Sequence, residues 1–187
     1  KDGYLKRFSE RAYAANEGQL PATKDTDRLI GVRSCDTLDT LLLFTQKGNY
    51  ISLPVYKIDE CRFKDLGKHV SSYVKLDTQE DIVSAILVKN FNSYIFVLSL
   101  TKNGMIKKSS LPKYEVSRNT KALGAMKLKD GDEVVSVCLC KEGDDILVIS
   151  KNGYYNYYSS SILQDLAVRA QGVSAINIKE DEAVAVL

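Results

Sequence analysis

The stretch SLTKNGMIKKSSLPKY, residues 99–114, joins an apolar run to a Lys-Asn-Gly turn and then to a segment rich in lysine. The same pattern around a turn glycine occurs four times, as KDGYLKRFS from Lys1, TQKGNYISLPVYK from Thr45, TKNGMIKKSSLPK from Thr101 and SKNGYYNYYSSS from Ser150. The turn glycines are 45, 56 and 49 residues apart. A period of this size predicts a repeat architecture, such as a solenoid, a propeller or an array.

A second marker, an acidic residue followed by a β-branched run, keeps the same period. It appears as DRLIGV from Asp27, EDIVSA from Glu80, DEVVSV from Asp132 and DEAVAV from Asp181. Because the two markers keep their order, we divide the chain into a partial unit 1–26, units 27–79, 80–131 and 132–180, and the start of another at 181–187. The abrupt opening and end predict one domain that is truncated at both ends.

Each unit is predicted to contain roughly four short strands. Apolar runs at 41–44, 94–98 and 146–149, bounded by turn residues, are typical of strands buried on both faces. Asn-Gly pairs predict tight hairpin turns, because both residues accept a positive φ. Helical periodicity is weak, and the best helix candidate covers 161–167. Such units predict an all-β, propeller-like fold, although the WD and kelch signatures are absent.

The composition and motifs exclude several classes of protein. The 187 residues, 44% hydrophobic and 27% charged, suffice for one well-buried domain, and no apolar run is long enough to span a membrane. The four cysteines lack zinc spacing and are interpreted as buried, reduced thiols, and His69 is expected at the surface or in a cap. No P-loop, GxGxxG, HExxH or paired nucleophile and base is present, so no catalytic residue, metal site or cofactor is predicted.

Charge is distributed unevenly although the net charge is only +2. The region after the third turn is basic, with Lys102, Lys107, Lys108, Lys113, Arg118 and Lys121 against Glu115 alone. The region before the next turn is acidic, with Asp130, Asp132, Glu133, Glu142, Asp144 and Asp145 against Lys141 alone. In a ring of blades, the bases after each turn would line one rim, which is expected of a surface that follows a nucleic-acid backbone. The alternative is a solvated face without a partner.

Four phrases resemble a known family: GYLKRFSERAY, LLLFTQKGNYISLPVYKI, LGKHVSSYVKL and TKNGMIKKSSLPKY. Together they are similar to the C-terminal domain of type IIA topoisomerase A subunits, nearest to the topoisomerase IV branch of Gram-positive bacteria. The resemblance covers the whole chain. It implies a β-pinwheel, a propeller-like disc whose blades exchange strands, with a basic outer rim that binds and bends duplex DNA.

The resemblance also implies a role within a larger enzyme. The domain would present DNA to the strand-passage core for decatenation and relaxation, beside the A-subunit dimer and the ATPase B subunit. Magnesium and ATP would be used elsewhere in that enzyme, which would be cytoplasmic, bacterial and associated with the nucleoid. The expected DNA-binding residues, which would act on phosphates as a sum, are Lys6, Arg7, Lys47, Lys57, Arg62, Lys64, Lys68, Lys102, Lys107, Lys108, Lys113, Arg118 and Lys121.

Two alternatives remain open on the sequence. Gyrase A subunits carry a QRRGGKG-like box in the first blade, whereas the corresponding stretch here, AYAANEGQLPATKDTD, has no Arg-Arg pair and no double glycine. This difference favours the topoisomerase IV branch and weaker DNA wrapping, with a gyrase whose box is degenerate as the alternative. A propeller-like disc can also serve as a platform for protein interactions.

Overall fold

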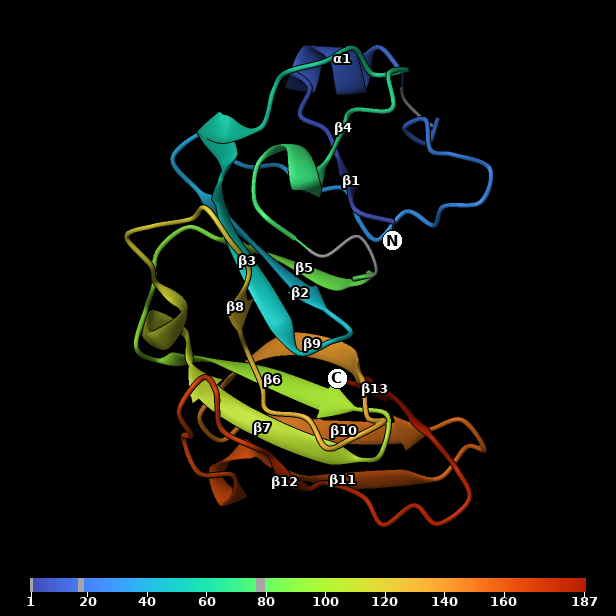
Figure 1. The fold of residues 1–187 in the computed structure, drawn as a ribbon, viewed down its shortest axis with the longest axis vertical. Helices are drawn as coiled ribbons and strands as arrows, with labels where there is room; N and C mark the ends of the chain where they lie inside the picture. Colours follow the sequence, from blue (N-terminus) through green and yellow to red (C-terminus); the bar gives the residue numbers. More distant parts are fainter. Residues whose placement is uncertain (1, 17–18, 77–79) are drawn as a thin grey trace.

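The structure, a computed structural model, describes residues 2–16, 19–76 and 80–187. Within these residues, 13 strands form four sheets. The first residue of the first repeat and part of the AYAANEGQLPATKDTD stretch lie outside the described residues. None of the described helices is long and apolar enough to cross a membrane. The prediction of an all-β fold is confirmed, and the sheets follow one another from top to bottom of Figure 1.

Three of the sheets are built on an antiparallel hairpin closed by the repeated glycine turn. The hairpins are β2 (Thr40–Thr45) with β3 (Asn49–Pro54), β6 (Ile95–Thr101) with β7 (Met105–Ser110), and β10 (Asp145–Ser150) with β11 (Tyr155–Ser159). Gly104 has φ of +78° in the second of these turns. A side chain there would be strained, and its Cβ would also lie 2.8 Å from the Ile176 carbonyl oxygen of the following unit.

Each hairpin is extended by strands that come later in the chain. Its first strand pairs with the next long strand, namely β5 (Ile82–Val88), β9 (Val134–Lys141) or β13 (Ala183–Val186). The short strands β8 (Leu123–Gly124) and β12 (Val173–Ser174) pair with β3 and β7, and β4 (Lys68–His69) pairs with β1 (Tyr4–Leu5). Because β8 follows the β6–β7 hairpin but completes the sheet of β2 and β3, the predicted exchange of strands between blades is confirmed.

Short 3-10 helices follow the hairpins. They are η1 (Val55–Lys57), η3 (Leu111–Tyr114) and η4 (Ser160–Ile162), with η2 (Val70–Ser72) after β4 and one short α-helix, α1 (Glu10–Ala14). The expected helix at 161–167 is wrong beyond η4, because the Leu166 N–H donates to the Lys108 carbonyl instead of continuing a helical ladder. The marker stretch DRLIGV at 27–32 forms no strand, whereas the matching stretches of the later units lie in β5, β9 and β13.

Apolar cores fill the spaces between successive sheets. Leu43, Ile51 and Val70 pack between the first two sheets, Phe44, Val97 and Tyr114 between the next two, and Leu98, Ile106 and Val148 between the last two. Most of the run at 41–44 is buried, as predicted. The run at 94–98 is buried only at Val97 and Leu98, because Tyr94 is exposed and Ile95 and Phe96 are half-buried, and β10 alternates between buried and half-buried residues. Adjacent sheets are therefore held together mainly by apolar burial, worth about 1.5–3 kcal/mol for each large side chain.

Two minor predictions have mixed outcomes. The His69 ring caps η2, because its Nδ1 accepts the Ser71 N–H at 3.2 Å. All four cysteines are free, but only Cys140 is fully buried and Cys35 is exposed. The prediction of a capping histidine is confirmed, whereas the prediction that all the thiols are buried is wrong.

Candidate nucleic-acid interface

The acidic residue that opens each of the last two repeat markers binds the tight turn of the preceding hairpin. Asp132 Oδ1 accepts the N–H groups of Asn103 at 3.0 Å and of Glu133 at 2.9 Å. Asp181 Oδ1 accepts the Asn152 N–H in the same way at 3.2 Å. Short acidic side chains are suited to this role, since they reach backbone donors that a turn leaves unpaired. The repeated acids therefore fix the turns rather than forming only a solvated face.

Lys107, on β7, points into the core and not toward solvent. Its side chain is fully buried, and Nζ donates to Ser109 Oγ at 2.5 Å and to the Tyr114 hydroxyl at 3.1 Å. Burial lowers its pKa from 10.5 to about 7. The matching position of the preceding hairpin, three residues after the turn glycine, holds the equally buried Ile51. The prediction that Lys107 contacts phosphate is wrong, because this position faces the neighbouring blade.

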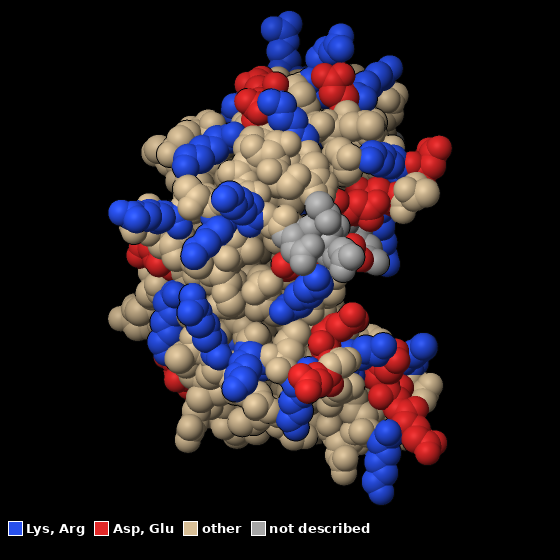
Figure 2. Space-filling view, viewed as in Figure 1, with Lys and Arg blue, Asp and Glu red and all other residues tan. Residues whose placement is uncertain are grey.

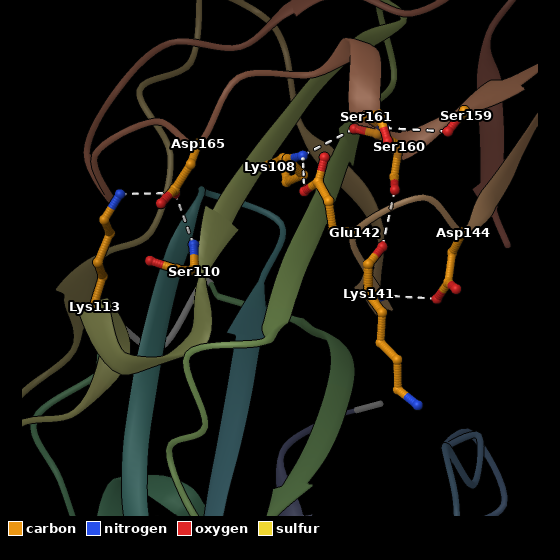
Figure 3. A network of polar contacts seen from close by, with 10 residues as sticks. All are labelled: Lys108, Ser110, Lys113, Lys141, Glu142, Asp144, Ser159, Ser160, Ser161 and Asp165. Carbon is orange, nitrogen blue, oxygen red and sulfur yellow. Dashed lines mark hydrogen bonds and ion pairs between the residues drawn. The ribbon is translucent and has the colours of Figure 1, made fainter.

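Lys108, the next residue, is also enclosed, with 3% of its side chain exposed. Its ammonium donates to Glu142 Oε2 and to the Ser160 carbonyl, each at 2.9 Å (Figure 3). It also lies 4.8 Å from the centroid of the Phe96 ring. These contacts join β7 to the end of β9 and to η4. The prediction that Lys108 contacts phosphate is therefore also wrong.

The first repeat uses its two basic residues in a similar way. Lys6 Nζ donates at 2.7–3.2 Å to three backbone carbonyls, those of Ala22, Phe63 and Asp65. Arg7 Nε donates to the Ile58 carbonyl at 3.0 Å, and Arg7 pairs with Glu60 at 3.6 Å. Desolvation lowers the pKa of Lys6. Lys6 and Arg7 are half-buried and bonded to the backbone, and their contact with DNA stays a prediction.

Four other predicted residues form ion pairs on the surface. These are Lys68 with Asp59 at 2.8 Å, Lys102 with Glu182 at 3.0 Å, Lys113 with Asp165 at 2.7 Å and Arg62 with Asp65 at 3.4 Å. The hydrogen bond from Lys68 holds the pKa of Asp59 below its ordinary value, and the one from Lys102 does the same for Glu182. Exposed pairs of this kind contribute about 0–1 kcal/mol. Their cations can therefore exchange partners, and their contact with DNA stays a prediction.

The remaining predicted residues are exposed: Lys47, Lys57, Lys64, Arg118 and Lys121. Lys47 lies at the tip of the β2–β3 turn, and the others lie in or after a 3-10 helix. We call the segments between a 3-10 helix and the following short strand the post-helix segments: residues 58–67, 115–122 and 163–172. Within the described part of the chain, Lys64, Arg118 and Lys121 have no carboxylate partner, since the aspartates of these segments bind other cations.

Two exposed cations that the sequence reasoning missed, Arg169 and Lys75, lie beside these residues. The Arg169 side chain lies against Gly124, and the backbone of Lys75 bonds to that of Thr120 and Ala122. A signal for Arg169 is present in the sequence. The phrases KDLG from Lys64, KALG from Lys121 and RAQG from Arg169 each place a cation three residues before a glycine at the short strand.

Contacts between units bring these cations onto one surface. Lys57 Nζ donates to Asn119 Oδ1 at 2.8 Å, which joins η1 to the post-helix segment of the next unit. That segment also holds Arg118 and Lys121 and bonds to Lys75, while Arg169 adjoins β8 at its end. We call these five residues the rim cluster: Lys57, Lys75, Arg118, Lys121 and Arg169.

The short 3-10 helices that follow the hairpins and the hairpin turns lie on opposite sides of the molecule (Figure 1). Figure 1 shows η1, η3 and η4 at the left, whereas the turns of the three hairpins point to the right. In the same view, basic side chains cover the left and centre of the surface, and most acidic side chains lie at the top and right (Figure 2). Of the residues expected on a basic rim, Lys57, Arg118 and Lys121 belong to the rim cluster, and their contact with DNA stays a prediction.

Comparison with known proteins connects this geometry to a family. The sequence profile described as "DNA gyrase C-terminal domain, beta-propeller" matches residues 39–89, 96–140 and 167–187. The chain belongs to this family. The family name agrees with the propeller-like topology, and the predicted relationship to type IIA topoisomerase A subunits is confirmed.

Relatives in this family include the DNA topoisomerase 4 subunits A of Bacillus subtilis, 42% identical over 98% of this chain, and of Staphylococcus epidermidis, 40% identical over 97%. The chain spans 23% of the length of each of these two relatives. A crystal structure of the C-terminal domain of DNA topoisomerase IV is 42% identical, with a TM-score of 0.89, and the match covers all of this chain and 58% of that chain. A DNA gyrase A C-terminal domain shares the fold at 22% identity, with a TM-score of 0.73 over 62% of its length.

Proposed function

We propose that this domain binds duplex DNA through the rim cluster and bends it, as a non-catalytic part of an ATP-dependent type II topoisomerase of the topoisomerase IV type. In that enzyme it would deliver a duplex to the strand-passage core, beside the A-subunit dimer and the ATPase B subunit, and so favour decatenation and relaxation. Membership of the family and the relatives named above support this role.

The observation on which the proposal depends is the repetition of exposed cations in the post-helix segments. Lys121 and Arg169 come from successive units and lie on one surface, and neither has a carboxylate partner among the described residues. Lys64 holds the matching place one unit earlier. Cations repeated along an edge suit a polymer whose charges are also repeated, and each neutralised phosphate releases counterions.

Bending places a requirement on the number of contacts. Curving a duplex of 20–30 bp costs about 1–6 kcal/mol, so several phosphate contacts are needed to offset it. Cations provided by three successive units can satisfy this requirement by following one duplex along the edge of the disc. Such contacts position the DNA but read no bases, so we expect little sequence preference.

The test is a comparison of duplex affinity for the wild-type domain and the variant Arg118→Glu/Lys121→Glu, measured across a series of salt concentrations. We expect weaker binding and a smaller slope of log Kd against log salt, by about 0.9 for each phosphate that the variant no longer neutralises. The matched control is Lys141→Glu/Lys151→Glu, which reverses two exposed lysines outside the rim cluster. Equal losses of affinity in the two double variants would contradict the assignment to the rim cluster, and no binding by the wild type would contradict the function.

A further inference from the structure

The Lys107 amine is the centre of a buried polar cluster between two blades. Lys107 and Ser109 lie on β7, Tyr114 lies on η3, and all three side chains are buried. Ser99, also buried, lies directly opposite Lys107 on β6. The Tyr114 ring extends the cluster to the preceding blade, because it packs edge-on against Tyr50 at 5.1 Å and Phe44 at 5.8 Å.

No carboxylate is bonded to the Lys107 amine among the described residues. Its two hydrogen-bond partners are hydroxyl groups, and the Tyr114 ring centroid lies 5.6 Å away. Two charged groups act on its pKa: Lys113 on η3 disfavours its protonation, and Asp165 after η4 favours it. These two groups pair with each other, so their opposing fields partly cancel. Burial is therefore the main influence on the pKa of the Lys107 amine.

The tyrosines of the cluster remain neutral while Lys107 changes charge. Burial raises the pKa of both Tyr50 and Tyr114. The charge of Arg169 opposes the rise in the pKa of Tyr50 only in part. An uncharged amine can remain in this apolar site, and it can accept a hydrogen bond from a hydroxyl group. A charged ammonium bears the cost of desolvation without an anion beside it.

We propose that Lys107 makes the docking of η3 on the preceding blade sensitive to protonation. With the amine neutral, η3 stays packed and Tyr114 remains between the blades. When the amine takes up a proton from solvent, η3 opens locally so that the ammonium reaches water. The post-helix segment 115–122 follows η3 directly, so it moves with this opening.

The proposal itself does not depend on DNA binding, although its consequence for function does. Segment 115–122 contains Arg118 and Lys121, which belong to the rim cluster. If the proposed function is correct, proton uptake at Lys107 changes the placement of two phosphate-binding residues. The experiment that tests the protonation uses no DNA, so its failure is distinguishable from a failure of the proposed function.

The test is NMR of the domain with labelled lysine side chains, combined with hydrogen exchange of backbone amides across the same pH range. We expect the Lys107 side chain to titrate near 7, against 10.5 for an ordinary lysine. Exchange at η3 and at 115–122, corrected for the intrinsic rate, should increase as the pH falls through that titration. A Lys107 side chain that titrates near 10.5, or exchange at η3 that does not follow its titration, would overturn the proposal.

A variant gives a second readout that is independent of the NMR assignment. Lys107→Met keeps the length of the side chain and removes the charge, and the matching Ile51 shows that an apolar residue fits this position. The ratio of unfolding constants between wild type and Lys107→Met should change about tenfold per pH unit between about 7 and 10, because one proton is linked to unfolding there. Lys121→Met, at an exposed lysine, is the control and should show no such dependence. A ratio for Lys107→Met that stays constant over this range would also overturn the proposal.

Discussion

The Lys108 ammonium lies 2.9 Å from the Glu142 carboxylate, although the Lys108 side chain is 3% exposed and that of Glu142 is 55% exposed. The pair thus joins an enclosed cation to an anion that remains in water, across the boundary between β7 and the end of β9. The carboxylate is hydrated on its outer side, so the anion avoids most of the desolvation cost of a fully buried pair.

The Lys108–Glu142 pair predicts that the domain loses stability as the pH falls into the acid range. The hydrogen bond from Lys108 lowers the pKa of Glu142 from its ordinary 4.5. The contribution of the Lys108–Glu142 pair to stability is therefore fully present above about pH 4.5. It is lost as the pH falls through the lower pKa that Glu142 has in the folded protein. We expect Glu142→Gln to be less stable than wild type near neutrality and the two to converge in acid, as measured by urea unfolding at several pH values. Glu115→Gln is the control, and a constant difference down to low pH would contradict the prediction.

Replacing different turn glycines by alanine is expected to lower stability by unequal amounts. Gly104→Ala is strained by φ of +78°, and its methyl group would also lie 2.8 Å from the Ile176 carbonyl oxygen. Gly153→Ala has the strain alone, since nothing lies within 4 Å of its methyl group. We expect a loss of about 1–2 kcal/mol for Gly153→Ala and a clearly larger loss for Gly104→Ala, in chemical denaturation. Equal losses would mean that the turn and the following unit are not in close contact.

The contact of Asp132 with the β6–β7 turn predicts a loss of stability when this aspartate is replaced. Asp132, which is 7% exposed, accepts two backbone N–H groups. Asp132→Ala leaves both donors without this partner, and we expect a cost of about 1–3 kcal/mol. The matched control is Asp130→Ala, at an exposed aspartate two residues away. Thermal unfolding of the two variants measures the difference. Similar melting temperatures would show that the hydrogen bonds to Asp132 contribute little to stability.

The repeated cations predict an additive effect on DNA binding. Lys64→Gln, Lys121→Gln and Arg169→Gln remove matching charges from three units without introducing repulsion. We expect the combined variant to lower the slope of log Kd against log salt by about 0.9 for each contact, whereas Lys68→Gln should change it less because Lys68 is paired with Asp59. Fluorescence anisotropy with a labelled duplex measures both slopes. An unchanged slope in the combined variant would place the DNA elsewhere.

Much of the fold was predictable because its signals are local. The Asn-Gly turn at Asn103 and Gly104 specifies a hairpin, and the apolar runs on either side specify strands. The marker stretch at 27–32 forms no strand, unlike the matching stretches in β5, β9 and β13, because a strand exists only when a partner strand is available. Whether a partner strand is available depends on the tertiary structure, and the sequence of 27–32 alone does not show it.

The candidate site was less predictable, since the direction of a side chain depends on the register of the sheet. Lys107 and Lys108 looked like surface lysines because lysine is rarely buried. The matching position of the preceding hairpin holds Ile51, which was the available sign that this position faces a core. Arg169 was missed because it stands alone, whereas its repetition with Lys64 and Lys121 before a glycine was visible in the sequence.

The exchange of strands also has a consequence for cooperativity. Residues 171–187 contain β12 and β13, which belong to two different sheets, those of β7 and of β10. Loss of this one segment would leave unpaired edges in both sheets, so damage in one unit spreads to its predecessor. A sequence unit is therefore not a unit of folding, and we expect the three hairpins to melt together in a single transition instead of one at a time.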